Sequence, residues 1–202
     1  FRCGPIAGWL NEEPRSQAHL AAAARVAWAA VGAGLLELVA EPAAALEVDV
    51  LGPLYERLRP GKAKQARGEF YTPGPVAEMM AAISVGALRP GQSICDPTAG
   101  MGGLLRACAQ ALCAEGRDPA AFWWYGCDIE PLAVAGLAVN AQLWGLGPHV
   151  VIGCANVLAE PDWEVRAREE QTAALDGQRS RVAAARLIAA TTGHLEAAGE
   201  GS

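Results

Sequence analysis

The fold is decided by the stretch Asp96-Pro97-Thr98-Ala99-Gly100-Met101-Gly102-Gly103-Leu104-Leu105. Its glycines at positions 100, 102 and 103 let the backbone turn sharply and approach a ligand with no Cβ in the way. A helix is expected directly afterwards, and the first turn of a helix presents free N–H groups. The stretch therefore predicts a strand-to-helix turn beside a ligand, with a tight turn that binds nothing as the alternative.

The acidic residue that opens this stretch limits the kind of ligand. Asp96 stands at the expected strand end, where its carboxylate repels a phosphate but suits a cation or a hydroxyl group. The Gly-x-Gly-x-x-Gly fingerprint of dinucleotide-binding folds also fails, because Leu105 occupies the position of its third glycine. Both observations argue against a dinucleotide site.

Strand and helix signals alternate around the glycine-rich stretch. Short apolar runs and large β-formers predict strands, and the alanine- and leucine-rich segments between them predict helices. The expected strands are residues 92–95, 122–127 and 149–153, and the expected helices are residues 104–115 and 132–144. This βαβαβ order indicates an α/β fold whose Rossmann-like, partial parallel sheet is flanked by N- and C-terminal helices. Right-handed crossovers then place ligand chemistry at the carboxyl ends of the strands.

Polar residues follow the second and third expected strands. Asp128 stands where the acid of a βαβ ligand site binds ribose hydroxyls, and Ile129 beside it offers an apolar surface to a base ring. The alternative is that Asp128 or Glu130 caps the helix that begins at Pro131. After the third strand, Asn156 carries an amide that can both donate to and accept from an adenine edge.

Charge narrows the possible partners. The chain has 202 residues and a net charge of −6, which excludes a generally basic nucleic-acid binder. A basic stretch nevertheless runs over residues 57–67 with no acid inside it, and Pro60 and Gly61 predict a loop there. It is interpreted either as a loop that contacts DNA phosphates or as a solvated connector. Its cations are Arg57, Arg59, Lys62, Lys64 and Arg67.

Apolar runs and cysteines bear on the compartment. The longest apolar run of the N-terminal third, residues 26–36, has 11 residues, whereas a bilayer span needs about 20. There is no signal-peptide pattern and no Cys-x-x-Cys pair, so we expect a cytoplasmic protein without a membrane partner or a metal site. Cys95, Cys127 and Cys154 lie in or beside apolar runs and are expected to be small buried thiols.

Composition divides the chain into three regions. We expect an N-terminal helical region over residues 1–60, a ligand-binding core over 61–163, and a C-terminal helical region with a tail over 164–202. Gly177 is expected to break the last helical stretch into two. The amphipathic pattern and polar tail at the end of the sequence lead us to expect a finished chain.

Four segments, in order, resemble motifs of the N6-adenine DNA methylases, in the modification-subunit branch found in type I restriction–modification systems. Residues 49–56 resemble the helix before the catalytic domain, and residues 68–73, with Phe-Tyr-Thr-Pro, resemble the N-terminal cofactor motif. Residues 96–105 resemble the S-adenosylmethionine loop, and residues 126–130, with the helix through Asn140, resemble the ribose-binding motif. The resemblance covers roughly residues 46–163.

This resemblance implies an S-adenosylmethionine-dependent methyltransferase core acting in DNA methylation, with DNA and a further protein chain as partners. It implies that Asp128 accepts from the ribose, that Asn156 holds the adenine, and that Ile129 packs against that ring with Phe70 or Tyr71. The implied cofactor-binding residues are Phe70, Tyr71, Thr72, Pro73, Asp96, Thr98, Gly100, Gly102, Gly103, Asp128, Ile129 and Asn156.

The sequence departs from the family pattern at the target-base site. The family carries an Asn- or Asp-Pro-Pro-aromatic motif after its fourth strand, and this chain contains no Pro-Pro pair. The segment Glu160-Pro161-Asp162-Trp163 bears a faint likeness to it, which makes Glu160 and Trp163 the candidate catalytic residues. That segment starts only four residues after Asn156, too close to span a helix and a further strand.

Three interpretations of the function therefore stay open. The chain is an adenine-N6 DNA methyltransferase whose catalytic motif is degenerate or supplied elsewhere. Alternatively, it is a non-catalytic pseudo-methylase that binds the cofactor and serves as a partner or DNA-interaction module. The third interpretation is a folded fragment with no specific activity.

Overall fold

The computed structural model describes residues 17–58, 72–177 and 179–180 of the chain. The first described region is helical, as expected. Its helices are α2 (Gln17–Gly32), α3 (Leu35–Ala40), α4 (Pro42–Glu47) and α5 (Leu51–Leu58). Pro42 is the first residue of α4. A backbone N–H at this position would have no acceptor within the helix, so proline is tolerated there. None of the described helices is both long and apolar enough to cross a membrane.

The second described region contains the alternating core. Its elements are α7 (Gly74–Val85), β1 (Ser93–Asp96), α8 (Gly103–Ala114), the 3₁₀ turn η1 (Pro119–Ala121), β2 (Trp123–Asp128), α9 (Pro131–Leu143) and β3 (Val150–Cys154), and a further helix follows over residues 163–177. Each strand begins and ends one residue later than predicted, because backbone pairing rather than side-chain type sets its limits. As a result, Asp96 and Asp128 are the last paired residues of their strands.

The three strands form one parallel sheet in the order β1-β2-β3. Ile94 lies opposite Trp124, which in turn lies opposite Val150, and Asp96 lies opposite Gly126. Helices α8 and α9 make the two crossovers between neighbouring strands, as parallel pairing requires. The expected α/β fold with a partial parallel sheet flanked by helices is therefore confirmed.

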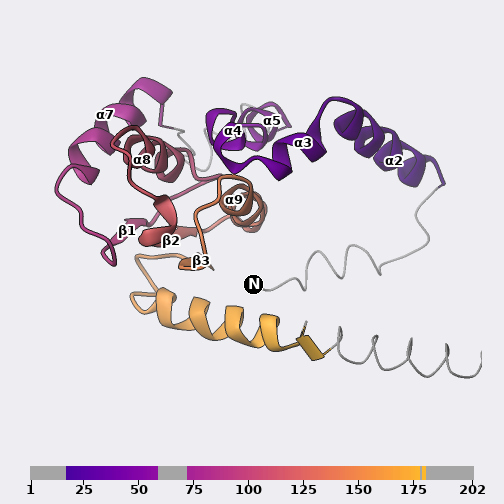
Figure 1. Ribbon diagram of the computed structural model, residues 1–202. Helices are drawn as coiled ribbons and strands as arrows, with labels where there is room; N and C mark the ends of the chain where they lie inside the picture. The colour runs from indigo at the N-terminus through magenta and orange to yellow at the C-terminus, as the bar shows by residue number, and fades with distance from the viewer. Residues whose placement is uncertain (1–16, 59–71, 178, 181–202) are drawn as a thin grey trace, which may run out of the picture.

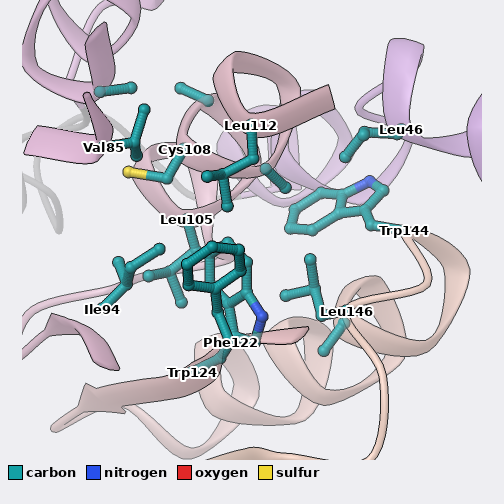
Figure 2. Close-up of a cluster of buried hydrophobic side chains, with 14 of the residues drawn as sticks. Leu46, Val85, Ile94, Leu105, Cys108, Leu112, Phe122, Trp124, Trp144 and Leu146 are labelled. Carbon is teal, nitrogen blue, oxygen red and sulfur yellow. The ribbon is translucent and has the colours of Figure 1, made fainter. Parts of the chain in front are cut away.

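One face of the sheet carries the main core. Helices α7, α8 and α9 lie on this face, with α4 and α5 beside them (Figure 1). Figure 2 shows Leu105 and Leu112 of α8 above Phe122 and Trp124 in this buried cluster. Leu46 of α4 belongs to the same buried cluster, so the N-terminal helices are packed against the α/β core.

The opposite face of the sheet is covered by the helix over residues 163–177 (Figure 1). Trp163 and Ala167 of this helix pack on Cys127 and Val151. Gly153 permits this contact, since a Cβ there would lie 2.6 Å from the Trp163 ring. Gly177 is itself helical and is the last described residue of the run that begins at residue 163, so the expected break into two helices stays a prediction.

The expectation of buried thiols holds for Cys127 alone among the three cysteines considered. Cys127 is buried in the centre of the sheet, whereas Cys95 and Cys154 are exposed. Cys95 lies in β1, and its side chain is on the face of the sheet opposite α8. Among the described residues, β1 is an edge strand that pairs with β2 alone. Cys154 ends β3, where the chain leaves the sheet. The apolar runs around both residues reflect their neighbours on the other face.

Candidate functional site

The carboxyl end of β1 presents a buried acid. Asp96 is only 8% exposed, and its Oδ1 accepts from the backbone N–H of Thr98 at 3.1 Å. Burial raises the pKa of the Asp96 carboxyl, and the nearby charge of Asp128 raises it further, while the Thr98 bond opposes both effects. Among the described residues, no cation pairs with Asp96. A positively charged ligand placed here would relieve this unfavourable charge.

The glycine-rich turn is held by the end of the next strand. Gly100 donates its backbone N–H to Oδ2 of Asp128 at 2.8 Å, and Glu130 donates its own to Oδ1 at 2.9 Å. Gly102 then caps α8 with a φ of 94°, a left-handed conformation that favours glycine. Asp128 therefore shapes the turn as well as facing the ligand site.

A buried amide fixes the same turn from behind. Asn140 of α9 is 1% exposed, and its Nδ2 donates to the carbonyl of Met101 at 2.9 Å. Its Oδ1 is also buried and has no hydrogen-bond partner among the described residues. Because a buried amide costs free energy unless it is bonded, its presence in an otherwise apolar helix face indicates that it positions the turn.

These elements enclose a pocket of about 420 Å³ at the carboxyl edge of the sheet. Such a volume falls in the range of small-molecule sites, roughly 300–1,000 Å³. Helix α5 and Asp49, which stands two residues before it, also line the pocket. The described lining residues are Asp49, Gly52, Tyr55, Glu56, Thr72, Asp96, Thr98, Ala99, Gly100, Met101, Gly103, Leu104, Asp128, Ile129, Glu130 and Ala133.

The contribution of α5 was missed by the sequence analysis, which assigned this segment to packing and family likeness. The signal was present in the spacing: Gly52 and Glu56 stand four residues apart, which places them on one helix face, and Asp49 precedes that helix. Gly52 also donates its N–H to Oδ1 of Asp49 at 2.8 Å, which orients that acid at the start of the helix. Spacing alone does not say what this face meets.

Most of the predicted cofactor residues that the structure describes meet at the pocket. The lining includes Thr72, Asp96, Thr98, Gly100, Gly103, Asp128 and Ile129. Gly102 shapes the turn without lining the pocket, and Pro73 is the residue before α7. Phe70 and Tyr71 lie outside the described residues.

Asn156 is placed apart from these residues. It is exposed and is not one of the described lining residues of the pocket. Its Oδ1 accepts from the N–H of Leu158 at 3.2 Å, and its own N–H donates to Glu160 at 3.3 Å. In this conformation the Asn156 side chain shapes the turn after β3.

The two candidate catalytic residues both have structural contacts. Glu160 forms an ion pair with Arg166 at 2.6 Å. Trp163 is buried against the sheet, on the face opposite α8 and α9. Among the predicted basic residues, Arg57 is exposed in the last turn of α5, and Arg59, Lys62, Lys64 and Arg67 lie outside the described residues. In the described part of the chain, no three His, Cys, Asp or Glu side chains converge as a metal site.

Comparison with known proteins identifies a matching family and a similar solved structure. A family model described as N-6 DNA Methylase matches residues 46–176, well over half of the chain. A crystal structure of the type I restriction-modification system methyltransferase subunit from Streptococcus thermophilus is 29% identical, with a TM-score of 0.40. That match covers 47% of this chain and 20% of the other, so it spans about a fifth of the Streptococcus subunit.

Proposed function

Because the chain belongs to the N-6 DNA methylase family, we propose that its pocket binds S-adenosylmethionine and that it forms the cofactor-binding part of an adenine-N6 DNA methyltransferase. The observation that carries the proposal is the meeting of Asp96, the glycine turn and Asp128 at one edge of the parallel sheet. Ligands of open α/β sheets bind at this edge.

The residues of the pocket fit the chemical groups of this cofactor. Asp128 keeps free lone pairs for ribose hydroxyls after its two backbone bonds, and Ile129, 68% exposed at the rim, offers an apolar surface to the adenine. Asp96 is proposed to face the cationic methionine end of the cofactor. Thr72 and the glycine backbone, which also line the pocket, are proposed to hold the carboxylate of that end. When bound, S-adenosylmethionine supplies an electrophilic methyl group on a sulfonium.

A second candidate function, cofactor binding without methyl transfer by this chain alone, has its own support. The 202 residues contain no Pro-Pro pair, so the family's target-base motif has no counterpart in them. Of the two candidate substitutes, Glu160 forms an ion pair with Arg166, and Trp163 is buried against the sheet on the face opposite α8. We therefore propose that the target adenine is held by residues other than these.

Calorimetric titration with S-adenosylmethionine tests the cofactor site, and a methyl-transfer assay on mixed-sequence DNA tests the activity. We expect binding that Asp128→Ala abolishes. Binding without transfer supports the second candidate. Transfer that disappears on Glu160→Ala would restore that residue as catalytic. If the cofactor does not bind, or if Asp128→Ala does not change its binding, the proposed cofactor site is wrong.

DNA and a second protein chain are the proposed macromolecular partners, in a cytoplasmic setting. Arg57 and the basic positions after it are proposed to contact DNA phosphates, which predicts binding that weakens steeply with salt. Replacing Lys62 and Lys64 by glutamate should weaken binding of a duplex in a mobility-shift assay and leave cofactor binding intact. Equal DNA binding by this variant would contradict the assignment.

A further inference from the structure

The described part of the pocket is charged with one sign. Its lining includes carboxylates from α5, β1 and the end of β2, and among the described lining residues there is no lysine, arginine or histidine. The five acids are Asp49, Glu56, Asp96, Asp128 and Glu130. All five line the same pocket, to which the segment around α5, the end of β1 and the end of β2 each contribute.

Three of these acids are held in place without being neutralised. Asp49, Asp96 and Asp128 each accept backbone N–H groups, which orient the carboxylate but carry no net charge. The charges also act on one another, since Asp128 contributes to the raised pKa of Asp96. A pocket walled by low-dielectric protein strengthens such a field relative to open water.

Glu56 differs from the other three because the fold does not use it. It is half-buried on the pocket face of α5, and no hydrogen bond or ion pair involves its side chain among the described residues. Its carboxylate is therefore available to a ligand. Glu56 lies in α5 and Asp49 stands two residues before that helix, and both acids line the pocket.

We propose that this pocket selects its ligand by charge, with Glu56 of α5 as a specificity-determining residue that favours a sulfonium over the corresponding neutral thioether. This rests on the proposed function. S-adenosylmethionine carries one net positive charge, whereas S-adenosylhomocysteine, which remains after methyl loss, carries none. The two share adenine, ribose and amino-acid groups, so contacts to those groups do not separate them. Charge selection thus lets the product leave while the cofactor stays bound.

Calorimetry of the whole chain with each of the two compounds, at low and high NaCl, tests the proposal. We expect S-adenosylmethionine to bind about tenfold more tightly at low salt, an advantage that shrinks between about 50 and 500 mM as screening shortens the reach of the carboxylates. Binding of S-adenosylhomocysteine should change little with salt. If the two compounds bind with equal affinity and neither affinity changes with salt, charge selection is wrong, while the proposed cofactor site still stands. If neither compound binds, the proposed function itself fails.

The variant Glu56→Gln keeps size and shape while removing the charge. It should weaken S-adenosylmethionine binding about fivefold and S-adenosylhomocysteine binding less than twofold, on the scale of one screened charge pair. The matched control is Glu169→Gln, which makes the same exchange at an exposed position on the helix that covers the other face of the sheet. A loss shared equally by both compounds, or an equal loss in the control, overturns the role of Glu56.

Discussion

Asp128 holds Gly100, a residue 28 positions earlier, by accepting its backbone N–H on Oδ2 at 2.8 Å. The other oxygen of the same carboxylate accepts from Glu130. One acid at the end of β2 thus fixes the turn at the end of β1 and the start of the segment leading to α9. The pocket depends on this link, because residues of the turn line it.

Replacing Asp128 by asparagine should loosen this arrangement. An amide keeps one acceptor oxygen, so one of the two backbone N–H groups loses its partner. We expect the free energy of unfolding to fall by about 1–3 kcal/mol, measured by urea denaturation followed by circular dichroism. Asp118→Asn is the control, since only one oxygen of Asp118 accepts, from Ala120. Equal stability of the two variants would contradict the double role of Asp128.

Two substitutions at Asn140 separate its hydrogen bond from its volume. Asn140→Asp turns the donor toward Met101 into a buried acceptor, which should cost more than about 3 kcal/mol of stability. Asn140→Leu leaves the carbonyl of Met101 without its partner but also removes the unpaired Oδ1, so a loss of about 1 kcal/mol is expected. Thermal denaturation of both variants measures this order. The reverse order would mean that Asn140 does not position the turn through its Nδ2.

Gly102 and Gly103 should respond differently to alanine. A Cβ on Gly102 would lie 2.5 Å from Leu137 Cδ1 at a φ of 94°, so Gly102→Ala should cost about 2 kcal/mol or more. At Gly103 a Cβ meets nothing within 4 Å, so Gly103→Ala should leave the melting temperature unchanged or raise it. Because Gly103 lines the pocket, the same variant should weaken binding of S-adenosylmethionine in calorimetry. Equal losses of stability would contradict the assigned backbone strain.

The buried carboxyl of Asp96 predicts a pH dependence. Its pKa lies above the ordinary 3.8, so the folded state keeps the proton to higher pH than the unfolded chain does. The stability contributed by Asp96 therefore falls as pH rises from 3.8 through the raised pKa of the folded state, and the cost is complete above that pKa. Asp96→Asn, which can still accept from Thr98, should be more stable than the parent at pH 7. Denaturation curves at several pH values should show this stability difference shrinking as pH falls toward 4. A difference that grows toward acid pH would contradict the raised pKa of Asp96.

Thiol reactivity checks which strand faces are covered. Cys95, Cys113 and Cys154 are exposed and should be alkylated by iodoacetamide at pH 8, as mapped by peptide mass spectrometry. Cys108 and Cys127 should resist, because both are buried and burial raises the pKa of each thiol to about 11. Labelling in urea provides the control in which all of them react. Rapid labelling of Cys127 in the folded protein would contradict the packing of residues 163–177 on the sheet.

Much of the α/β core could be predicted because its signals are local. Period-two and period-3.6 patterns gave the element order, and the carboxyl ends of neighbouring parallel strands necessarily meet at one edge. That geometry predicts that Asp96, Gly100 and Asp128 lie together. The exposure of Cys95 could not be predicted in the same way. It depends on how far the helix over residues 163–177 extends across the sheet, which is a long-range property.

The sequence by itself determined the parallel sheet, the glycine turn and the acids at the strand ends, since each follows from residues near one another in the chain. Only the tertiary structure decided that α5 closes the pocket and that Asn140 holds the turn from behind. It also decided that Asn156 hydrogen-bonds within the turn after β3 and that Trp163 packs on the sheet. The physical reason is that helix packing depends on the shape and burial of whole faces, so residues distant in sequence meet where no local pattern records their contact.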